Sequence, residues 1–195
     1  MKKLAFLLSI SAAALTFQGC GSGTKDAKET ADSLNTVKDT TSNVMATGGI
    51  AVDESDAMFA TKAAVGGMAE VEFANIALQK TANTQIKNFA NMMLKDHGKA
   101  NEELMSIAKI KNITLPAVLD DEHLQKKSEL DSKSGKDFDK IYVDAMVDGH
   151  QKTLKLMEDE AKDGKDSTLK AFAAKLVPIV QSHLGMINKI KEDMK

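Results

Sequence analysis

Arginine and tryptophan are absent from this 195-residue chain, and cysteine and tyrosine occur once each. A single cysteine cannot form a disulfide within the chain. Arginine is the side chain best suited to paired contacts with phosphates and bases, and the formal charge of -2 is small, so nucleic-acid binding is disfavoured. Without tryptophan, the core must be built mainly from Leu, Ile, Val, Met and Ala, a composition typical of packed helices.

The N-terminus has the pattern of a bacterial export signal. A basic start precedes an apolar run from residue 4 to residue 17, which is too short for a transmembrane helix of roughly 20 residues. Cys20 follows shortly after this run, at a position that resembles the lipobox cysteine of bacterial lipoproteins. We therefore expect a signal peptide at residues 1–19 and a lipidated Cys20, with ordinary secretion as the alternative.

A lipid on Cys20 would place the protein in the cell envelope, as a periplasmic or outer-membrane lipoprotein held to the membrane by that anchor. Loss of the signal peptide would remove two lysines and change the formal charge from -2 to -4. Residues 20–52 are polar and contain no aromatic side chain, so they bury too little apolar surface to offset their ordering entropy. We expect a disordered tether over residues 20–52 and one folded domain over residues 53–195, whose melting temperature does not depend on the tether.

Four long stretches of the folded domain repeat apolar residues at steps of three and four, the period of an amphipathic helix. They cover residues 55–81, 84–111, 136–162 and 166–194. Short connections join the first two stretches and the last two, whereas a longer polar link with room for one short helix joins the pairs. This organisation predicts an all-α fold, an antiparallel four-helix bundle with a long connection between its second and third helices.

Each predicted helix carries one polar residue with metal-binding potential on its apolar stripe: Glu70, His97, His150 and His183. At a rise of about 1.5 Å per residue, Glu70 and His97 lie roughly 17 and 20 Å from the turn that joins their helices, so they are level. His150 and His183 lie roughly 18 and 26 Å from their own turn, a looser match that a kink at Pro178 can correct. The sequence therefore predicts a polar layer at mid-height of the bundle.

The residues around the three histidines form three motifs: Lys95-Asp96-His97; Ser134-Gly135-Lys136-Asp137-Phe138-Asp139 through Tyr142 to Asp148-Gly149-His150; and Leu176-Val177-Pro178 through Gln181-Ser182-His183-Leu184. In this order and spacing they resemble the ferritin-like "domain of unknown function 4142" family of exported bacterial proteins, over about residues 55–190. The resemblance implies a ferritin-like four-helix bundle in the periplasm or outer membrane. It implies no established activity.

Ferritin-like di-iron centres need a Glu-x-x-His step on two helices and further glutamates from the other two. Here Leu94, Val147 and Val180 stand three residues before the histidines. The di-iron pattern is therefore absent, which disfavours a ferroxidase or di-iron oxygenase, and no catalytic residue is predicted.

Two hypotheses remain for the polar layer. In the first, its four residues bind a small ligand or, most simply, one divalent metal ion, zinc or copper, in a lipid-anchored protein of metal handling or stress protection. In the second, the layer is a buried hydrogen-bonded network in which the imidazoles pair with Asp96, Asp148, Tyr142 or one another. It then only specifies the fold of a non-catalytic structural or interaction module. The sequence indicates no particular protein partner, and we expect a monomer or a weak oligomer.

Overall fold

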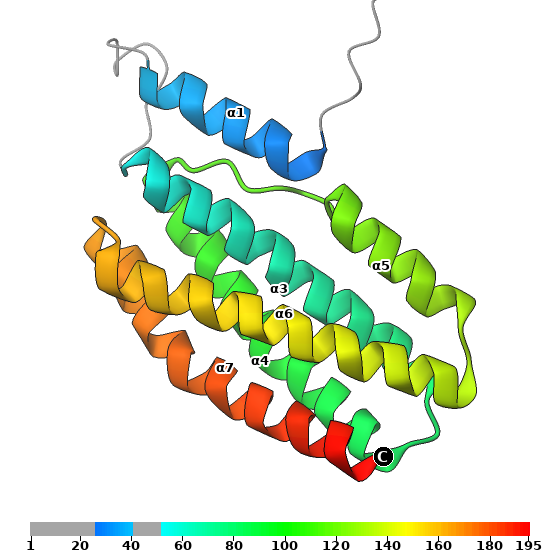
Figure 1. The fold of residues 1–195 in the computed structure, drawn as a ribbon. Coiled ribbons are helices and arrows are strands. Elements are labelled where there is room, and N and C mark those ends of the chain that lie inside the picture. The colour runs from blue at the N-terminus through cyan, green and yellow to red at the C-terminus, as the bar shows by residue number, and fades with distance from the viewer. Residues whose placement is uncertain (1–25, 41–51) are drawn as a thin grey trace, which may run out of the picture.

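The computed structural model describes residues 26–40 and 52–195, and within these ranges every regular element is a helix (Figure 1). The long helices are α3 (Glu54–Lys80), α4 (Thr84–Lys111), α6 (Gly135–Asp163) and α7 (Ser167–Asp193), and the shorter ones are α1 (Ala27–Thr40) and α5 (Asp121–Ser132). The bounds of the long helices lie within one residue of those predicted. The predicted signal peptide and Cys20 lie outside the described residues.

Capping side chains determine where three of the long helices begin. Asp53, Asn83 and Asp166 have extended backbones just before α3, α4 and α7. The side chain of each accepts a hydrogen bond from a backbone N–H in the first turn of its helix, where no helical carbonyl is available. Helix α6 ends at the predicted Gly164, and α7 continues through Pro178.

The four long helices pack side by side around two apolar clusters (Figure 1). Helix α3 contacts α4 and α6, and α7 contacts the same two helices. One cluster contains residues from the first halves of α3 and α7 and from the second halves of α4 and α6. The other cluster contains residues from the second halves of α3 and α7 and from the first halves of α4 and α6. Neighbouring long helices therefore run in opposite directions, and the three predicted histidines fall between the two clusters.

Helix α1 differs from the predicted tether. It packs against α3, and Ala31 and Asn35 are buried. The Asn35 amide donates to the carbonyl of Thr114 (2.9 Å), and the Thr114 N–H donates to Asn35 Oδ1 (2.7 Å). The disordered-tether prediction is therefore wrong for residues 27–40. The prediction considered only the apolar surface that this segment could bury, whereas α1 is held largely through polar side chains.

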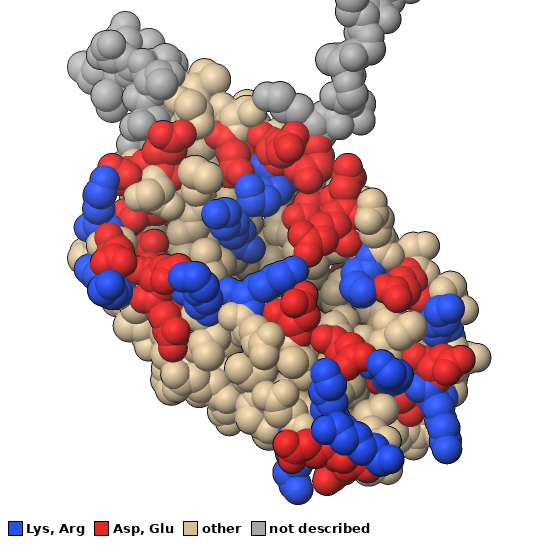
Figure 2. Space-filling model, in the orientation of Figure 1, with Lys and Arg blue, Asp and Glu red and all other residues tan. Residues whose placement is uncertain are grey.

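The surface of the molecule mixes charges of both signs. Figure 2 shows lysines interleaved with aspartates and glutamates over the face drawn, without a continuous basic surface. This distribution agrees with the small net charge. None of the helices in the described ranges is long and apolar enough to cross a membrane.

Asn35→Ala should lower the free energy of unfolding by about 1–3 kcal/mol, because it leaves the N–H and carbonyl of Thr114 without their partner. Urea denaturation followed by circular dichroism measures the change. Leu34→Ala is the control, since Leu34 lies on the same helix and is 48% exposed. Equal stability of Asn35→Ala and the unmodified chain would contradict the docking of α1.

Candidate metal centre

The three helix-borne histidines converge in the middle of the fold. Their ring centroids lie 5.6 Å apart for His97 and His150, 5.4 Å for His97 and His183, and 5.6 Å for His150 and His183. All three side chains are buried, with residue exposures of 7%, 0% and 2% for His97, His150 and His183. One ring nitrogen from each can be chosen so that all three lie within 4.8 Å of one another.

One nitrogen of each ring faces an oxygen on the outside of this cluster. His97 Nδ1 lies 2.7 Å from Glu70 Oε2, and His150 Nδ1 donates to the carbonyl of Met146 at 2.8 Å. His183 Nε2 donates to Asp96 Oδ2 at 3.1 Å. Carbonyl and carboxylate oxygens only accept hydrogen bonds, so the proton of each neutral ring is placed on its outer nitrogen.

The other nitrogen of each ring has no hydrogen-bond partner among the described residues: His97 Nε2, His150 Nε2 and His183 Nδ1. On a neutral ring each carries a lone pair that can bind a metal. Bonds of about 2.0–2.1 Å in a tetrahedral site would place such nitrogens about 3.3 Å apart. One nitrogen from each ring already lies within 4.8 Å of the others, so side-chain shifts on the order of 1 Å bring three imidazoles to that geometry. The residues present therefore fit a three-imidazole metal site.

Glu70 joins the polar layer at the predicted level but lies beside the outer nitrogens. Its Oε1 is 3.4 Å from His150 Nδ1, and neither of its oxygens makes a hydrogen bond of good geometry. It is not part of the three-nitrogen group, so its role as a direct ligand stays a prediction. Of the alternative partners, Tyr142 has a buried hydroxyl with no hydrogen bond to a described residue, and Asp148 pairs with Lys152.

A cavity of about 30 Å³ adjoins the histidine cluster. Its lining includes Glu70, Asp96, His97 and His183, and most of its other walls are apolar. This volume is close to that of one water molecule. On the opposite side, the ring of Phe89 packs 5.8 Å from His150 and 6.4 Å from His183, measured between centroids. The cluster is thus enclosed, with space beside it for one small ligand.

Burial and neighbouring charges shift the pKa values of all four groups of the polar layer. Burial raises the pKa of Glu70, but the facing imidazoles of His97 and His150 outweigh it and hold that pKa below its ordinary value. Burial lowers the pKa of His97, yet the Glu70 carboxylate reverses the direction and raises it. For His150 and His183 burial dominates, and their pKa values are lowered.

Sequence reasoning found the four residues of the layer and named Asp96 among the possible partners. It did not assign a particular partner to each ring. It missed the Met146 carbonyl, although the spacing of four residues to His150 on one helix was a usable signal. The enclosing Phe89 ring was missed as well.

Comparison with known proteins identifies relatives in sequence and in fold. A family described as "Domain of unknown function (DUF4142)" matches residues 40–190. No curated protein sequence matches the chain. Among solved structures, a DUF305 fragment from Deinococcus radiodurans has a TM-score of 0.64 at 8% identity, with 71% of this chain and 96% of the fragment covered.

Two further solved proteins have the same fold. A DUF305 protein from Streptomyces coelicolor, described as a candidate secreted protein, has a TM-score of 0.60 at 14% identity, with 71% of this chain and 93% of that chain covered. CopM in a Cu(II)-bound form has a TM-score of 0.62 at 14% identity, with coverages of 72% and 97%, and CopM also has an Ag-bound form. At these identities the likeness shows the fold alone.

The free energy of unfolding of the metal-free chain should fall as the pH is lowered from 6.5 to 5. The folded-state pKa values of His150 and His183 are lowered, so the unfolded chain takes up protons first in this range. The raised pKa of His97 affects stability only at higher pH. Its stabilising contribution is complete below the unfolded-state pKa of 6.5, and it is lost as the pH rises through the folded-state pKa. The lowered pKa of Glu70 contributes fully to the free energy of unfolding until the pH falls below the pKa of this side chain in the unfolded chain.

Urea denaturation at a series of pH values measures this slope, which corresponds to the uptake of up to two protons on unfolding. His183→Gln should reduce the slope, because its amide can still donate to Asp96 but does not titrate. A free energy of unfolding that stays constant or increases as the pH is lowered from 6.5 to 5 would show that the rings of His150 and His183 are not buried in the neutral form.

Proposed function

We propose that this chain, which belongs to the family described as a domain of unknown function (DUF4142), binds one metal ion between His97, His150 and His183. Its four long helices form a ferritin-like antiparallel four-helix bundle, with α5 inside the long connection. The packing of each long helix against two antiparallel neighbours supports this architecture.

The observation that carries the proposal is the orientation of the three imidazoles. Each of the three converging rings has one buried nitrogen without a partner, while an oxygen contacts its other nitrogen. Ligand histidines in metal proteins commonly donate their second N–H to a carboxylate or a backbone carbonyl in this way. Glu70 holds His97, supplies a compensating negative charge, and is close enough to be recruited as an oxygen ligand.

Imidazole nitrogens suit copper and zinc, and copper is the first candidate. CopM, which has the same fold, has been solved with Cu(II) and with Ag, and this supports the choice. The protein would then act in metal handling or in protection of the cell envelope against metal stress. The alternative is a structural module in which the layer only sets helix register. Three buried nitrogens without hydrogen bonds weigh against that alternative, because unsatisfied buried groups cost stability.

The protein works at the cell envelope as a lipoprotein, bound to the membrane through Cys20 after removal of residues 1–19. The export pattern of the N-terminus supports this placement, and the description of the Streptomyces coelicolor relative agrees with it. The bundle domain covers residues 53–195, with α1 docked on its surface. No nucleic acid is a partner, and the domain is a monomer or a weak oligomer.

The unmodified bundle should bind about one equivalent of Cu²⁺ or Zn²⁺, and His97→Ala, His150→Ala and His183→Ala should each abolish that binding, since each removes one nitrogen of the set. Metal should also raise the melting temperature, because it binds the folded state, and a chelator should reverse the gain. Calorimetric titration gives the stoichiometry. Cys20→Ser is included in every variant, so that no thiol competes for copper.

The matched control is His123→Ala. His123 lies on α5 outside the cluster and contacts Asp120, so its loss should leave the stoichiometry unchanged. An unmodified chain that binds neither ion after reconstitution would favour the structural alternative. In that case the three histidine variants should still destabilise the fold by about 1–3 kcal/mol each, through the partners that they leave unpaired.

Cys20→Ser should release the protein from the membrane fraction of expressing cells, because the thiol that carries the lipid is removed. Cell fractionation with immunodetection compares it with Ser22→Ala, a nearby change that retains the cysteine. A wild-type protein that is already soluble, with an N-terminus other than Cys20, would exclude the lipid anchor.

A further inference from the structure

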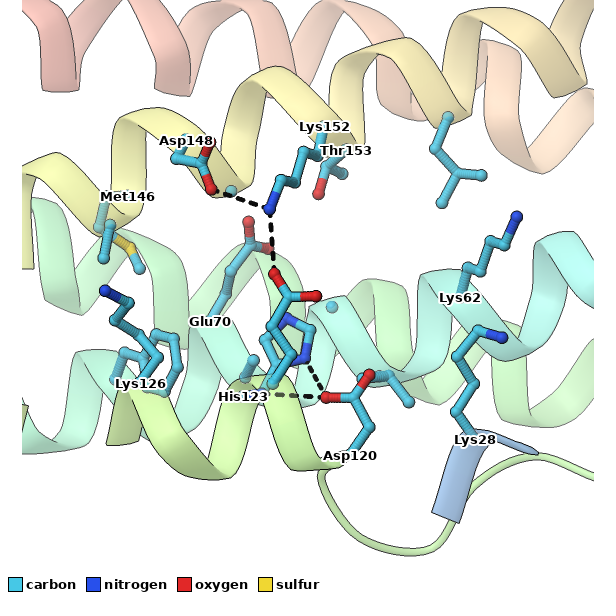
Figure 3. Close-up of a pocket in the computed structure, with 18 residues that line it drawn as sticks. Lys28, Lys62, Glu70, Asp120, His123, Lys126, Met146, Asp148, Lys152 and Thr153 are labelled. Carbon is cyan, nitrogen blue, oxygen red and sulfur yellow. Dashed lines mark hydrogen bonds and ion pairs between the residues drawn. The ribbon is translucent and has the colours of Figure 1, made fainter. Parts of the chain in front are cut away.

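The proposed metal site is enclosed, so an ion needs a passage through the protein to reach it. We propose, building on the function above, that metal enters and leaves through a cleft between α3, α5 and α6 whose inner end is Glu70. This α3–α6 cleft has a volume of about 380 Å³ and lies beside the histidine layer (Figure 3). Its floor is largely apolar, and lysine and acidic side chains surround its mouth.

The cleft and the small inner cavity share two wall residues. Glu70 and Thr153 line both the 380 Å³ cleft and the 30 Å³ cavity beside His97 and His183. In Figure 3, Glu70 projects from α3 toward α6. Glu70 is buried, and its oxygens make no hydrogen bond of good geometry. A cation in the cleft therefore meets a buried carboxylate that lies beside the imidazoles of His97 and His150.

Two glycines keep the inner part of this cleft open. Gly66 of α3 and Gly149 of α6 both line it, although glycine is a poor residue for the interior of a helix. A Cβ atom at Gly149 would lie 3.8 Å from Glu70 Oε1, and one at Gly66 would lie 3.9 Å from Thr153 Oγ1. Neither methyl group would clash, but each would add bulk beside one of the two shared wall residues. The missing side chains thus leave space where the passage meets the layer.

An exposed ion pair crosses the mouth of the cleft. Lys152 of α6 lies 3.0 Å from Glu122 of α5 and 3.0 Å from Asp148 of its own helix (Figure 3). All three side chains are more than half exposed, so this contact is weak and exchanges readily with water. It narrows the mouth without sealing it, and its lysine places a positive charge in the path of a cation.

The rate of metal binding tests the passage separately from its affinity. The chain with Cys20→Ser is mixed rapidly with Cu²⁺, and quenching of Tyr142, its only tyrosine in the absence of tryptophan, reports uptake. Mixing the loaded protein with a chelator reports release. Gly149→Leu should slow uptake and release by tenfold or more and by the same factor, so that the dissociation constant is unchanged. Gly149→Ala should slow both less and keeps the helix intact if the leucine variant fails to fold.

Gly98 provides the matched control, because it lies in α4 next to His97 but a Cβ atom added there would meet no neighbouring atom within 4 Å. Gly98→Ala and Gly98→Leu should leave both rates unchanged. The passage would be contradicted if Gly149→Ala and Gly149→Leu took up and released Cu²⁺ at normal rates, or if the Gly98 variants were slowed equally. Neither result would contradict the metal site. An unmodified chain that binds no Cu²⁺ at equilibrium overturns the metal site and the passage together.

The ion pair at the mouth gives a second, independent measurement. Lys152→Ala should accelerate uptake, since it widens the mouth and removes a positive charge from it. Lys155→Ala removes the same charge one turn along α6, from a side chain that does not line the cleft. Equal acceleration by both variants would mean that net charge, and not the cleft, determines the rate, and this would count against the passage.

Discussion

Three imidazoles and one carboxylate are buried at one level between two apolar clusters. Each long helix contributes one of these groups. A shift of one helix along its axis by a single turn would move its polar group about 5.4 Å into an apolar cluster. An unpaired polar group there costs about 1–3 kcal/mol, and an unpaired charge costs more. The layer therefore determines the register of all four helices.

The hydrogen bonds within the layer also leave one nitrogen of each ring available for a ligand. Glu70, the Met146 carbonyl and Asp96 each occupy one nitrogen of a different ring. These acceptors hold the rings in place, and the remaining nitrogen of each ring has no hydrogen-bond partner among the described residues. A purely structural network gains stability when every group is paired. Here the unpaired groups are collected at one point, which is the arrangement expected of a site whose partner comes from outside.

The smaller helices cover one side of this arrangement without closing it. Helix α1 packs on α3, and α5 contacts both α3 and α6 beside the cleft. Polar contacts connect both helices to the rest of the fold, through Asn35 with Thr114 and through Lys152 with Glu122, and Leu130 packs α5 into an apolar cluster. The fold that the chain shares with DUF305 proteins and CopM supplies the frame, and the particular side chains in the layer decide its chemistry.

The period of apolar residues was enough to predict the four long helices to within one residue, because caps and glycines mark their ends locally. Counting the helical rise also placed Glu70 and His97 at one level, and it matched His150 and His183 less closely. The sequence could not determine which ring nitrogen faces inward, since that depends on acceptors from the neighbouring helix and from the helix backbone. It also predicted a tether where α1 docks, because the partner of Asn35 lies 79 residues away. Helices follow from local periodicity, whereas the direction of a proton and the docking of a polar helix depend on groups that only the tertiary structure brings together.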